Sequence, residues 1–406
     1  MTHIPKLRFP EFTSPTAVKN LGDVVSIFNG YAFKSIDSAL NGVRWLKIAD
    51  VGIQIIEHNT PSFLPSLFSK KYSKFSLNEG DVVVALTRPI LGDKLKIALI
   101  DKKSHGALLN QRVGKLRTNE NLLYVYYLMQ SNKVITSIIN NIAGTDPPNL
   151  SPSEIKDISV QIGCCAEQQK IADFLTAVDR KISQLTEKHR LLNEYKKGAM
   201  QQLFSQRQRF KDKDGNTFPE WETYALKNVL ALQSDSLNML DETTYELITV
   251  KRGFGGVVSR GFFKGRDVLV KNQFTIHENE FVISKRQIVH GACGLVPKAL
   301  EGAIVSNEYN VFRPVESRLD IDYFNRFVIT PFMRKAFFIN SDGVHIEKLL
   351  FKTQSWLKTK VNLPCLAEQQ KIAQFLQAID NKIAAVAEQI EQTKLFKKGL
   401  LQQIFV

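Results

Sequence analysis

Residues 164–175 read CCAEQQKIADFL and residues 365–376 read CLAEQQKIAQFL, so the heptapeptide AEQQKIA occurs twice in this chain of 406 residues. The two copies are 201 residues apart, and about 40 residues match in register from each motif onward. Both stretches end alike, with KKG followed by QQLF in the first copy and QQIF in the second. A repeat of this length determines the architecture, because two copies of one sequence fold as two copies of one structural unit.

Each repeated stretch carries apolar side chains at alternating steps of four and three residues. This period of 3.5, sustained over more than four heptads, is the signature of a coiled coil. The alternative is an amphipathic helix that lies on a core by itself. The predicted seam consists of Ile171, Leu175, Val178, Ile182, Leu185, Leu192 and Leu203 in the first copy, and of Ile372, Leu376, Ile379, Ile383, Val386, Ile390, Leu400 and Ile404 in the second.

The lysines that interrupt the seam predict an antiparallel orientation. A parallel, in-register pair would place Lys196 directly opposite Lys397 among apolar side chains. Antiparallel packing separates them and relates the two halves by a pseudo-twofold axis. At 1.5 Å per residue, helices of about 40 residues extend roughly 60 Å, enough to act as a spacer. The predicted pairing joins Ile171 to Ile404, Leu185 to Ile390 and Lys196 to Ile379.

The remaining sequence corresponds more loosely between the halves and is rich in β-prone runs. FPEF at 9–12 returns as FPEW at 218–221. We predict an α+β fold with globular regions at 1–163 and 207–363, each followed by its repeated helix at 164–206 and 364–406. Predicted strands lie at 24–28, 82–86, 97–100, 113–116, 281–284 and 311–313, and shorter helices at 122–139 and 322–338.

The charge balance points to a polyanionic partner. Lys and Arg number 54 against 40 Asp and Glu, a net charge of +14. Such an excess favours nucleic acid first and an anionic membrane second. With 44% hydrophobic residues the chain is not disordered. Its longest apolar run, residues 82–86, is too short to span a bilayer, and the first residues lack the hydrophobic core of a signal peptide, so we expect a cytoplasmic protein.

The cysteines do not predict a metal site. Cys164, Cys165, Cys293 and Cys365 form no CxxC pair, and no histidine stands at zinc-ligand spacing. We therefore expect buried free thiols and no metal.

Motifs for catalysis are also weak. DPPN at 146–149 resembles the DPP-aromatic signature of amino-group DNA methyltransferases, but Asn149 cannot stack on a flipped base, so a proline-rich turn is the simpler interpretation. There is no phosphate-binding GxxxxGK[ST] loop. Glu278, Glu280 and Lys285 come nearest to a nuclease metal set, but the matching segment of the first half has no lysine at that place, so a solvated strand end is the preferred interpretation. We expect no catalytic residues and no cofactor.

What remains is a set of basic, aromatic and amide-bearing loops that recurs in both halves. Arg pairs with guanine, Asn and Gln with adenine, and Lys neutralises phosphate. Each residue alone could be a solvated surface side chain, and the recurrence of the clusters favours DNA contact. The candidates are Tyr31, Phe33, Lys34, Arg88, Lys94, Lys96, Gln111, Arg112 and Lys115 in the first half, and Lys251, Arg252, Arg260, Lys264, Arg266, Lys285, Arg286, Gln287, Asn307 and Asn310 in the second.

Taken together, the paired AEQQKIA motifs, the KKG and QQLF or QQIF endings, and the FPEF or FPEW that opens each half resemble the specificity (S) subunit of type I restriction-modification systems. The resemblance covers essentially the whole chain. One departure is Cys164-Cys165, where a proline often precedes the motif, whereas the second copy keeps Pro364.

The resemblance implies two target recognition domains, each reading one part of a bipartite double-stranded DNA target, and helices that act as conserved spacers. It also implies that methyltransferase subunits, two in number, dock on this framework, that restriction and motor subunits join the full complex, and that catalysis belongs to these partners. Two other classes stay open, a stand-alone DNA-modifying enzyme and a basic scaffold on a membrane surface.

Overall fold

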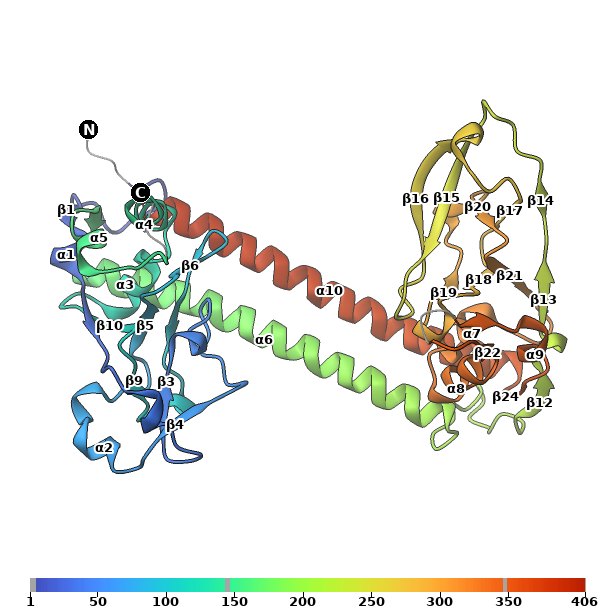
Figure 1. Cartoon of the computed structure of the whole chain (residues 1–406), viewed down its shortest axis with the longest axis horizontal. Coiled ribbons are helices and arrows are strands. Elements are labelled where there is room, and N and C mark those ends of the chain that lie inside the picture. The colour runs from blue at the N-terminus through green and yellow to red at the C-terminus, as the bar shows by residue number, and fades with distance from the viewer. Residues whose placement is uncertain (1–4, 143–146, 346–348, 406) are drawn as a thin grey trace. The chain divides into compact units, whose positions relative to one another are not determined.

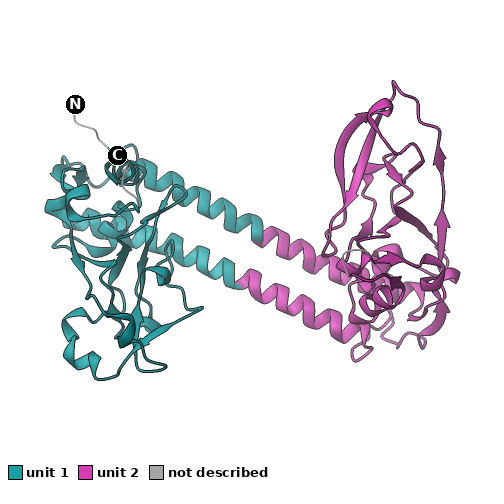
Figure 2. Cartoon of the chain, viewed as in Figure 1, with its two compact units in different colours: residues 1–187, 387–406 teal, residues 188–386 magenta. Residues whose placement is uncertain are grey.

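The structure, a computed structural model, describes residues 5–142, 147–345 and 349–405. It divides into two compact units, residues 1–187 with 387–406 (unit 1) and residues 188–386 (unit 2), as Figure 2 shows. The two long helices, α6 (Cys165–Phe204) and α10 (Leu366–Ile404), are labelled in Figure 1, and each contributes to both units (Figure 2). The helices lie within two residues of their predicted limits, while the assignment of recognition domains to 1–163 and 207–363 stays a prediction.

Unit 1 contains a central antiparallel sheet in the order β2-β10-β5-β8 and a smaller sheet in the order β4-β3-β9. A separate antiparallel pair joins β1, near the start of the unit, to β11, the strand that leads into α6. The strands are β1 (Ala17–Asn20), β2 (Ser26–Asn29), β3 (Val43–Leu46), β4 (Ser62–Leu64), β5 (Val82–Ala85), β6 (Ile90–Leu91), β7 (Lys94–Leu95), β8 (Ile97–Leu99), β9 (Leu108–Leu109), β10 (Val113–Arg117) and β11 (Ser159–Ile162). The helices are α1 (Leu21–Val24), α2 (Phe68–Lys71), α3 (Leu122–Leu128), α4 (Asn132–Ile142) and α5 (Pro152–Lys156).

Unit 2 repeats this plan. The sheet β13-β21-β18-β19 corresponds to β2-β10-β5-β8, and the pair β12–β24 corresponds to β1–β11. The strands are β12 (Glu222–Ala225), β13 (Leu230–Gln233), β14 (Ser236–Leu237), β15 (Thr244–Val250), β16 (Val257–Lys264), β17 (Gln273–Thr275), β18 (Phe281–Ser284), β19 (Cys293–Leu295), β20 (Ile304–Ser306), β21 (Tyr309–Pro314), β22 (Ser341–Asp342), β23 (Leu350–Phe351) and β24 (Lys360–Leu363). The helices are α7 (Ile321–Phe327), α8 (Pro331–Ile339) and α9 (Thr353–Trp356).

The second sheet differs most between the units. Both units contain a parallel strand pair, β3 with β9 and β15 with β20, flanked by an antiparallel neighbour. In unit 2 that neighbour is the long strand β16, and the sheet has the order β14-β17-β20-β15-β16. The repeat therefore preserves topology while the strands and loops around it change length.

Two predicted helices are each broken in two. The stretch 122–139 forms α3 and α4, and 322–338 forms α7 and α8. In unit 2 the break is a new helix start, because Thr330 accepts a hydrogen bond from the backbone of Met333 and Pro331 occupies the first turn. Ser131 accepts the equivalent bond from Val134 in unit 1.

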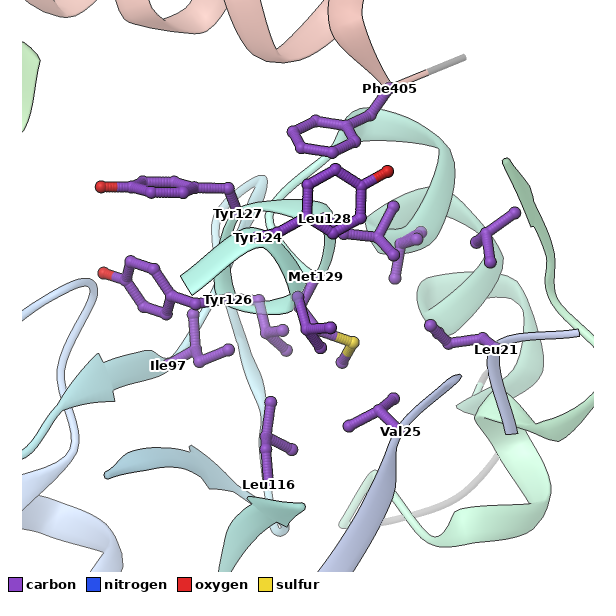
Figure 3. Packing of buried hydrophobic residues seen from close by; sticks show 14 of the residues in the cluster. Leu21, Val25, Ile97, Leu116, Tyr124, Tyr126, Tyr127, Leu128, Met129 and Phe405 are labelled. Atoms are coloured by element: carbon purple, nitrogen blue, oxygen red, sulfur yellow. The ribbon is translucent and has the colours of Figure 1, made fainter. Parts of the chain in front are cut away.

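Apolar side chains from the sheets and short helices pack directly on the long helices. In unit 1, Tyr124 of α3 meets Phe405 at the end of α10, with ring centroids 5.3 Å apart (Figure 3). Leu175 and Leu376 are fully buried, in unit 1 and unit 2 respectively. Burying one leucine contributes about 2 kcal/mol. Of the predicted seam residues, Ile182, Leu192 and Ile383 are half-buried and the other twelve are buried.

Ion pairs confirm the antiparallel orientation within each unit. Lys397 Nζ lies 2.5 Å from Asp179 Oδ1 in unit 1, and Lys196 Nζ lies 2.6 Å from Asp380 Oδ1 in unit 2. The two ion pairs are equivalent, because Lys196 corresponds to Lys397 and Asp179 to Asp380 in the 201-residue repeat. The register agrees with the predicted one to within one residue, since Lys196 reaches Asp380 rather than facing Ile379.

The repeated AEQQK sequence connects each globular part to the start of its helix. Arg8 donates two hydrogen bonds to Glu167, both of 2.7 Å, and Arg209 does the same to Glu368 at 3.2 and 2.9 Å. The following glutamine, Gln168 or Gln369, accepts a hydrogen bond from the backbone that begins α3 or α7. The motif is therefore used twice for the same structural purpose.

Candidate nucleic-acid interface

Several predicted recognition residues of unit 1 meet near the ends of β5 and β10. The backbone N–H of Leu86 donates to the carbonyl of Arg112 at 2.9 Å, and that of Gln111 donates to Tyr31 at 3.0 Å. Arg88, two residues beyond Leu86, is exposed and has a left-handed backbone, with φ of 47°. A non-glycine residue in this conformation is uncommon and marks a locally constrained turn. The fold thus gathers loops that are far apart in the sequence.

The aromatic residues in this region have different roles. Tyr31 is 38% exposed, and its ring centroid lies 4.6 Å from that of Tyr72. Hydrogen bonding to Tyr72 raises the pKa of Tyr31. Phe33 is only 6% exposed and packs against Trp45. Phe33 was predicted to contact DNA, but its burial in the core of the small sheet removes it from the surface.

The cations of unit 1 separate into paired and unpaired groups. Lys115 forms a 2.6 Å ion pair with Asp81. Lys96 is half-buried beside the carbonyl of Ile48, and burial lowers its pKa. Among the described residues, no carboxylate pairs with the exposed side chains of Lys34, Arg88, Lys94 and Arg112. These four are the predicted cations of unit 1 that remain available for phosphate or base contact, and Tyr31 and Gln111 of the predicted set are exposed as well.

A second basic surface in unit 1 escaped the sequence prediction. In α2 and the turn after it, Phe68, Tyr72 and Phe75 pack inward on Phe33 or Phe28. The exposed lysines that alternate with them are Lys70, Lys71 and Lys74. Its signal was present in the sequence SKKYSKF at 69–75, where cations and aromatic residues interleave.

In unit 2, the loop after β18 contacts the turn before β21. Lys285 Nζ donates to the carbonyl of Asn307, and Arg286 Nε donates to Glu308 Oε2 at 2.7 Å. Gln287 Oε1 is buried without a hydrogen-bond partner among the described residues. Asn310, also predicted to contact DNA, is 6% exposed and donates to Thr353 Oγ1 at 2.6 Å, so this amide serves the core.

The hairpin of β15 and β16 carries the other predicted cations of unit 2. A β-bulge lies between Leu247 and Ile248 of β15, opposite Arg260 on β16. Bulges redirect side chains, and Arg260 lines a cavity of about 390 Å³ that Glu308 also lines. Lys264 and Arg266 both pair with Glu242, at 3.1 and 3.0 Å.

The loop that holds Lys251 and Arg252 packs beside the segment after Gln287. The N–H of Gly253 donates to the carbonyl of His290 at 2.7 Å. Lys251 is exposed, and like Arg260 it has no carboxylate partner in the described part of the chain. Lys251, Arg286 and Gln287 therefore border one region of unit 2.

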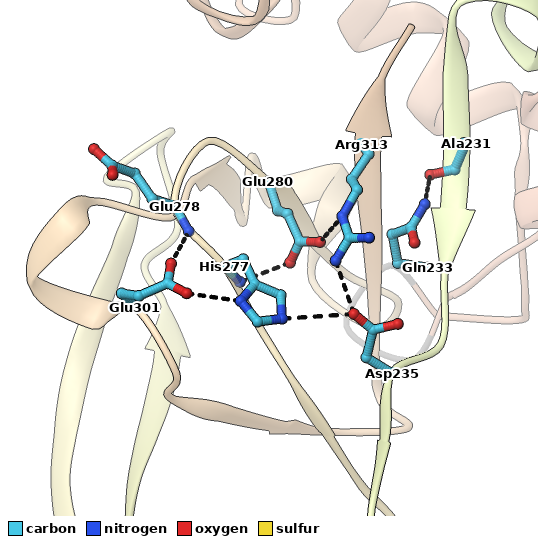
Figure 4. Close-up of polar contacts among 8 residues, drawn as sticks. All are labelled: Ala231, Gln233, Asp235, His277, Glu278, Glu280, Glu301 and Arg313. Carbon is cyan, nitrogen blue, oxygen red and sulfur yellow. Dashed lines mark hydrogen bonds and ion pairs between the residues drawn. The ribbon is translucent and has the colours of Figure 1, made fainter.

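Of the two glutamates that looked most like a nuclease site, Glu280 belongs to an ion-pair network, whereas Glu278 contributes only its backbone N–H, which donates to Glu301 (Figure 4). Glu280 is 2% exposed and accepts from Arg313 Nε at 2.6 Å. His277 contacts Glu301 at 2.7 Å, and this hydrogen bond lowers the pKa of Glu301. The expectation of a solvated strand end is therefore wrong for Glu280, because its carboxylate is buried against the guanidinium of Arg313.

Other motifs have simple structural positions. Asn149 forms an isolated antiparallel β-bridge with Thr87, just after β5, whereas Asp146 lies outside the described residues. All four thiols are free. The expectation of burial holds for Cys293 but not for Cys164 and Cys165, which are exposed at the start of α6, and Cys365 is half-buried. Across the described residues, no three His, Cys, Asp or Glu side chains are grouped to hold a metal ion. None of the described helices is long and apolar enough to cross a membrane.

Curated relatives share parts of the sequence with this chain. The MjaVIII specificity subunit of a type I restriction enzyme from Methanocaldococcus jannaschii is 31% identical over 210 residues, which cover 51% of this chain and 49% of the relative. The EcoAI specificity subunit from Escherichia coli is 33% identical over 121 residues, 29% of this chain and 20% of the relative. These matches thus span half or less of those relatives. A putative MjaX specificity subunit from M. jannaschii aligns over 98% of this chain and 94% of its own length at 23% identity.

Solved structures share the fold. The S subunit of a type I restriction-modification system from M. genitalium superposes with a TM-score of 0.58 at 13% identity, covering 100% of this chain and 99% of that one. A chain from a structure of the complex assembly and conformational transition of the type I R-M system superposes with a TM-score of 0.54 at 16% identity, covering 97% of this chain and 98% of that one.

The family described as the type I restriction modification DNA specificity domain matches this chain twice, at residues 14–194 and 219–394. Each match contains a globular part and most of the helix that follows it, as the repeat predicts. The chain belongs to the type I restriction-modification DNA specificity family.

Proposed function

We propose that this chain is the DNA-recognition subunit of a type I restriction-modification complex. Each half, 1–163 and 207–363, reads one part of a bipartite double-stranded target. The paired helices set the spacing and form a platform on which two methyltransferase subunits dock, with restriction and motor subunits completing the complex. The chain itself is non-catalytic and binds no cofactor, because methylation and cleavage belong to those partners.

One observation carries this proposal: a single scaffold is repeated with different exposed cations on each copy. The central sheets share their strand order, and both are fixed to a long helix by the same Arg–Glu pair, Arg8–Glu167 and Arg209–Glu368. The loops at the ends of β5 and β18 differ, with Arg88 in one and Arg286-Gln287 in the other. Equal scaffolds with unequal loops suit one task performed on two different sequences.

The isolated chain is expected to bind DNA electrostatically with little sequence preference until methyltransferase subunits are present. Its logarithmic affinity should fall linearly with logarithmic salt concentration, by about 0.9 per phosphate neutralised. Fluorescence anisotropy on a labelled duplex measures this slope. Lys94→Ala should reduce the slope by about one if Lys94 contacts a phosphate. An affinity that does not change between low and moderate salt would refute the DNA-binding role.

The two halves should be separable by mutation. Arg112→Ala is expected to relax recognition at one half-site only, and Arg286→Ala at the other only. If the side chain reads a base, about 1–3 kcal/mol of discrimination is lost at that position. The measurement is competition binding of the complex with methyltransferase subunits against duplexes mutated in either half. Equal losses on every duplex would instead identify phosphate contacts.

A further inference from the structure

Unit 2 contains a cavity of about 750 Å³ beside the C-terminal quarter of α6. Its lining includes residues of α6 between Asn193 and Phe204 and residues of the turn from Phe327 to Arg334 that joins α7 and α8. The volume lies in the range of pockets that hold a ligand or a partner's side chains.

The floor of the cavity is apolar and partly open to solvent. Met200, Phe204, Trp221 and Phe327 contribute to it, and the Phe204 and Phe327 ring centroids are 5.7 Å apart. Phe332 also lines the cavity and is 50% exposed, with its ring centroid 6.1 Å from that of Phe327. Contiguous apolar surface that reaches solvent is a common feature of interaction sites. The floor favours a large apolar side chain.

Every charged side chain that lines the cavity is a cation. Lys196 pairs with Asp380, whereas Lys197, Arg334 and Lys360 have no carboxylate partner in the described part of the chain. The first turn of α8 lines the cavity too, and a helix N-terminus carries partial positive charge. The rim therefore favours carboxylates around the apolar group.

At the equivalent helix position of unit 1, a carboxylate of the same chain pairs with the corresponding lysine. Under the repeat, Lys398 of α10 corresponds to Lys197, and Lys398 lies 3.5 Å from Asp93 in the β6–β7 hairpin. Phe405, the counterpart of Phe204, is buried there, whereas Phe204 is half-buried. In unit 2 the segment between β18 and β19 contains a short helical turn, Ile288–His290, instead of a hairpin. Unit 1 thus supplies its own carboxylate at this helix position, and unit 2 does not.

We propose that the unit 2 cavity receives an acidic segment with a large apolar side chain from one methyltransferase subunit. This inference rests on the proposed function, in which methyltransferase subunits dock on the helices. The apolar side chain fills the floor between Phe204 and Phe332, and flanking carboxylates pair with Lys197, Arg334 and Lys360. In unit 1, Asp93 of the same chain already pairs with Lys398, the counterpart of Lys197, so the two methyltransferase subunits are held by unequal contacts.

The test uses the full-length chain and the purified methyltransferase subunit. Sedimentation velocity of the wild-type chain is expected to show two bound subunits, and Phe332→Asp and Arg334→Glu should each weaken one of them at least tenfold. Lys335→Glu, which makes the same charge change as Arg334→Glu on an exposed residue of α8 outside the cavity, is the matched control and should bind normally. Thermal melting of each variant confirms folding, and the salt slope of DNA binding should stay unchanged.

Trp221 provides a second readout, since it lines the cavity. Its fluorescence should change when the methyltransferase subunit binds the wild-type chain, and much less with Phe332→Asp. If both variants bind two subunits like the wild type, the inference is overturned while the proposed function stands. If the wild-type chain binds no methyltransferase, the docking part of the proposed function itself fails. Saturable quenching by ATP alone would assign the cavity to a small anion and also overturn the inference.

Discussion

Replacing Asp179 with lysine should destabilise unit 1 by more than about 3 kcal/mol, because it places two ammonium groups together in a buried helix contact. Lys397 is 5% exposed, and its Nζ contacts Asp179 at 2.5 Å and Gln54 Oε1 at 3.1 Å. Burial lowers the pKa of Lys397, and Asp179 opposes that shift. For a unit of this size the loss corresponds to about 6–12 °C in melting temperature.

The repeat provides a matched control for this prediction. Asp380 and Lys196 make the equivalent pair in unit 2, but their side chains are 32% and 28% exposed. Asp380 also lies 3.5 Å from Arg326, whose side chain is 9% exposed, so Asp380→Lys would disturb a second ion pair. Lys196→Ala removes only the partly exposed lysine and leaves Asp380 with Arg326, so it should cost less than Asp179→Lys, about 1 kcal/mol. The exchange Asp179→Lys with Lys397→Asp should recover most of the stability lost in the single variant. Calorimetry of all three variants measures this, and an exchange no more stable than Asp179→Lys would contradict the pairing.

A fragment that ends near Gln206 should form a homodimer. It keeps one globular part and the whole of α6, and the apolar seam of α6 is equivalent to that of the missing α10. Antiparallel self-pairing sets Ile171 against Leu203 and, by the observed register, places Asp179 of each copy next to Lys196 of the other. The apolar seam and two reciprocal ion pairs then stabilise the dimer. With methyltransferase subunits present, this dimer should recognise an inverted repeat of the first half-site, because target symmetry mirrors protein symmetry.

Light scattering at tens of micromolar measures the assembly. Leu185 is buried, so Leu185→Asp should weaken the dimer by more than a hundredfold, since a carboxylate would enter the seam. Thr186→Asp places the same group on an exposed position of α6 and should leave the dimer intact. A fragment that stays monomeric, or a Leu185→Asp variant that dimerises like the unmodified fragment, would contradict the claim that the apolar seam pairs the helices.

The parts predicted well were those with a long period or a repeat. The seam spacing predicted both helices, and the lysine interruptions predicted the orientation, since they are satisfied by Asp179 and Asp380 across the helix pair. The sequence could not show that α3 and α4, or α7 and α8, are separate, because Ser131 and Thr330 are helix caps only when their hydroxyls meet the following backbone.

The interface was harder to predict because exposure and pairing depend on distant segments. Phe33 and Asn310 have residue types suited to DNA contact, but Trp45 and Thr353 hold them in the core. Glu242 neutralises Lys264 and Arg266 across a strand pair, which no local pattern reveals. The lysines of α2 were missed because they lie outside the loops that recur between the halves.

The most direct test is to map methylated bases in cells that contain this chain and its methyltransferase, and again after residues 207–363 are replaced by those of a related subunit. We expect one bipartite motif in which one half and the spacer length persist while the other half changes. A continuous motif, or a replacement that alters both halves, would contradict the claim that each unit reads one part of the target.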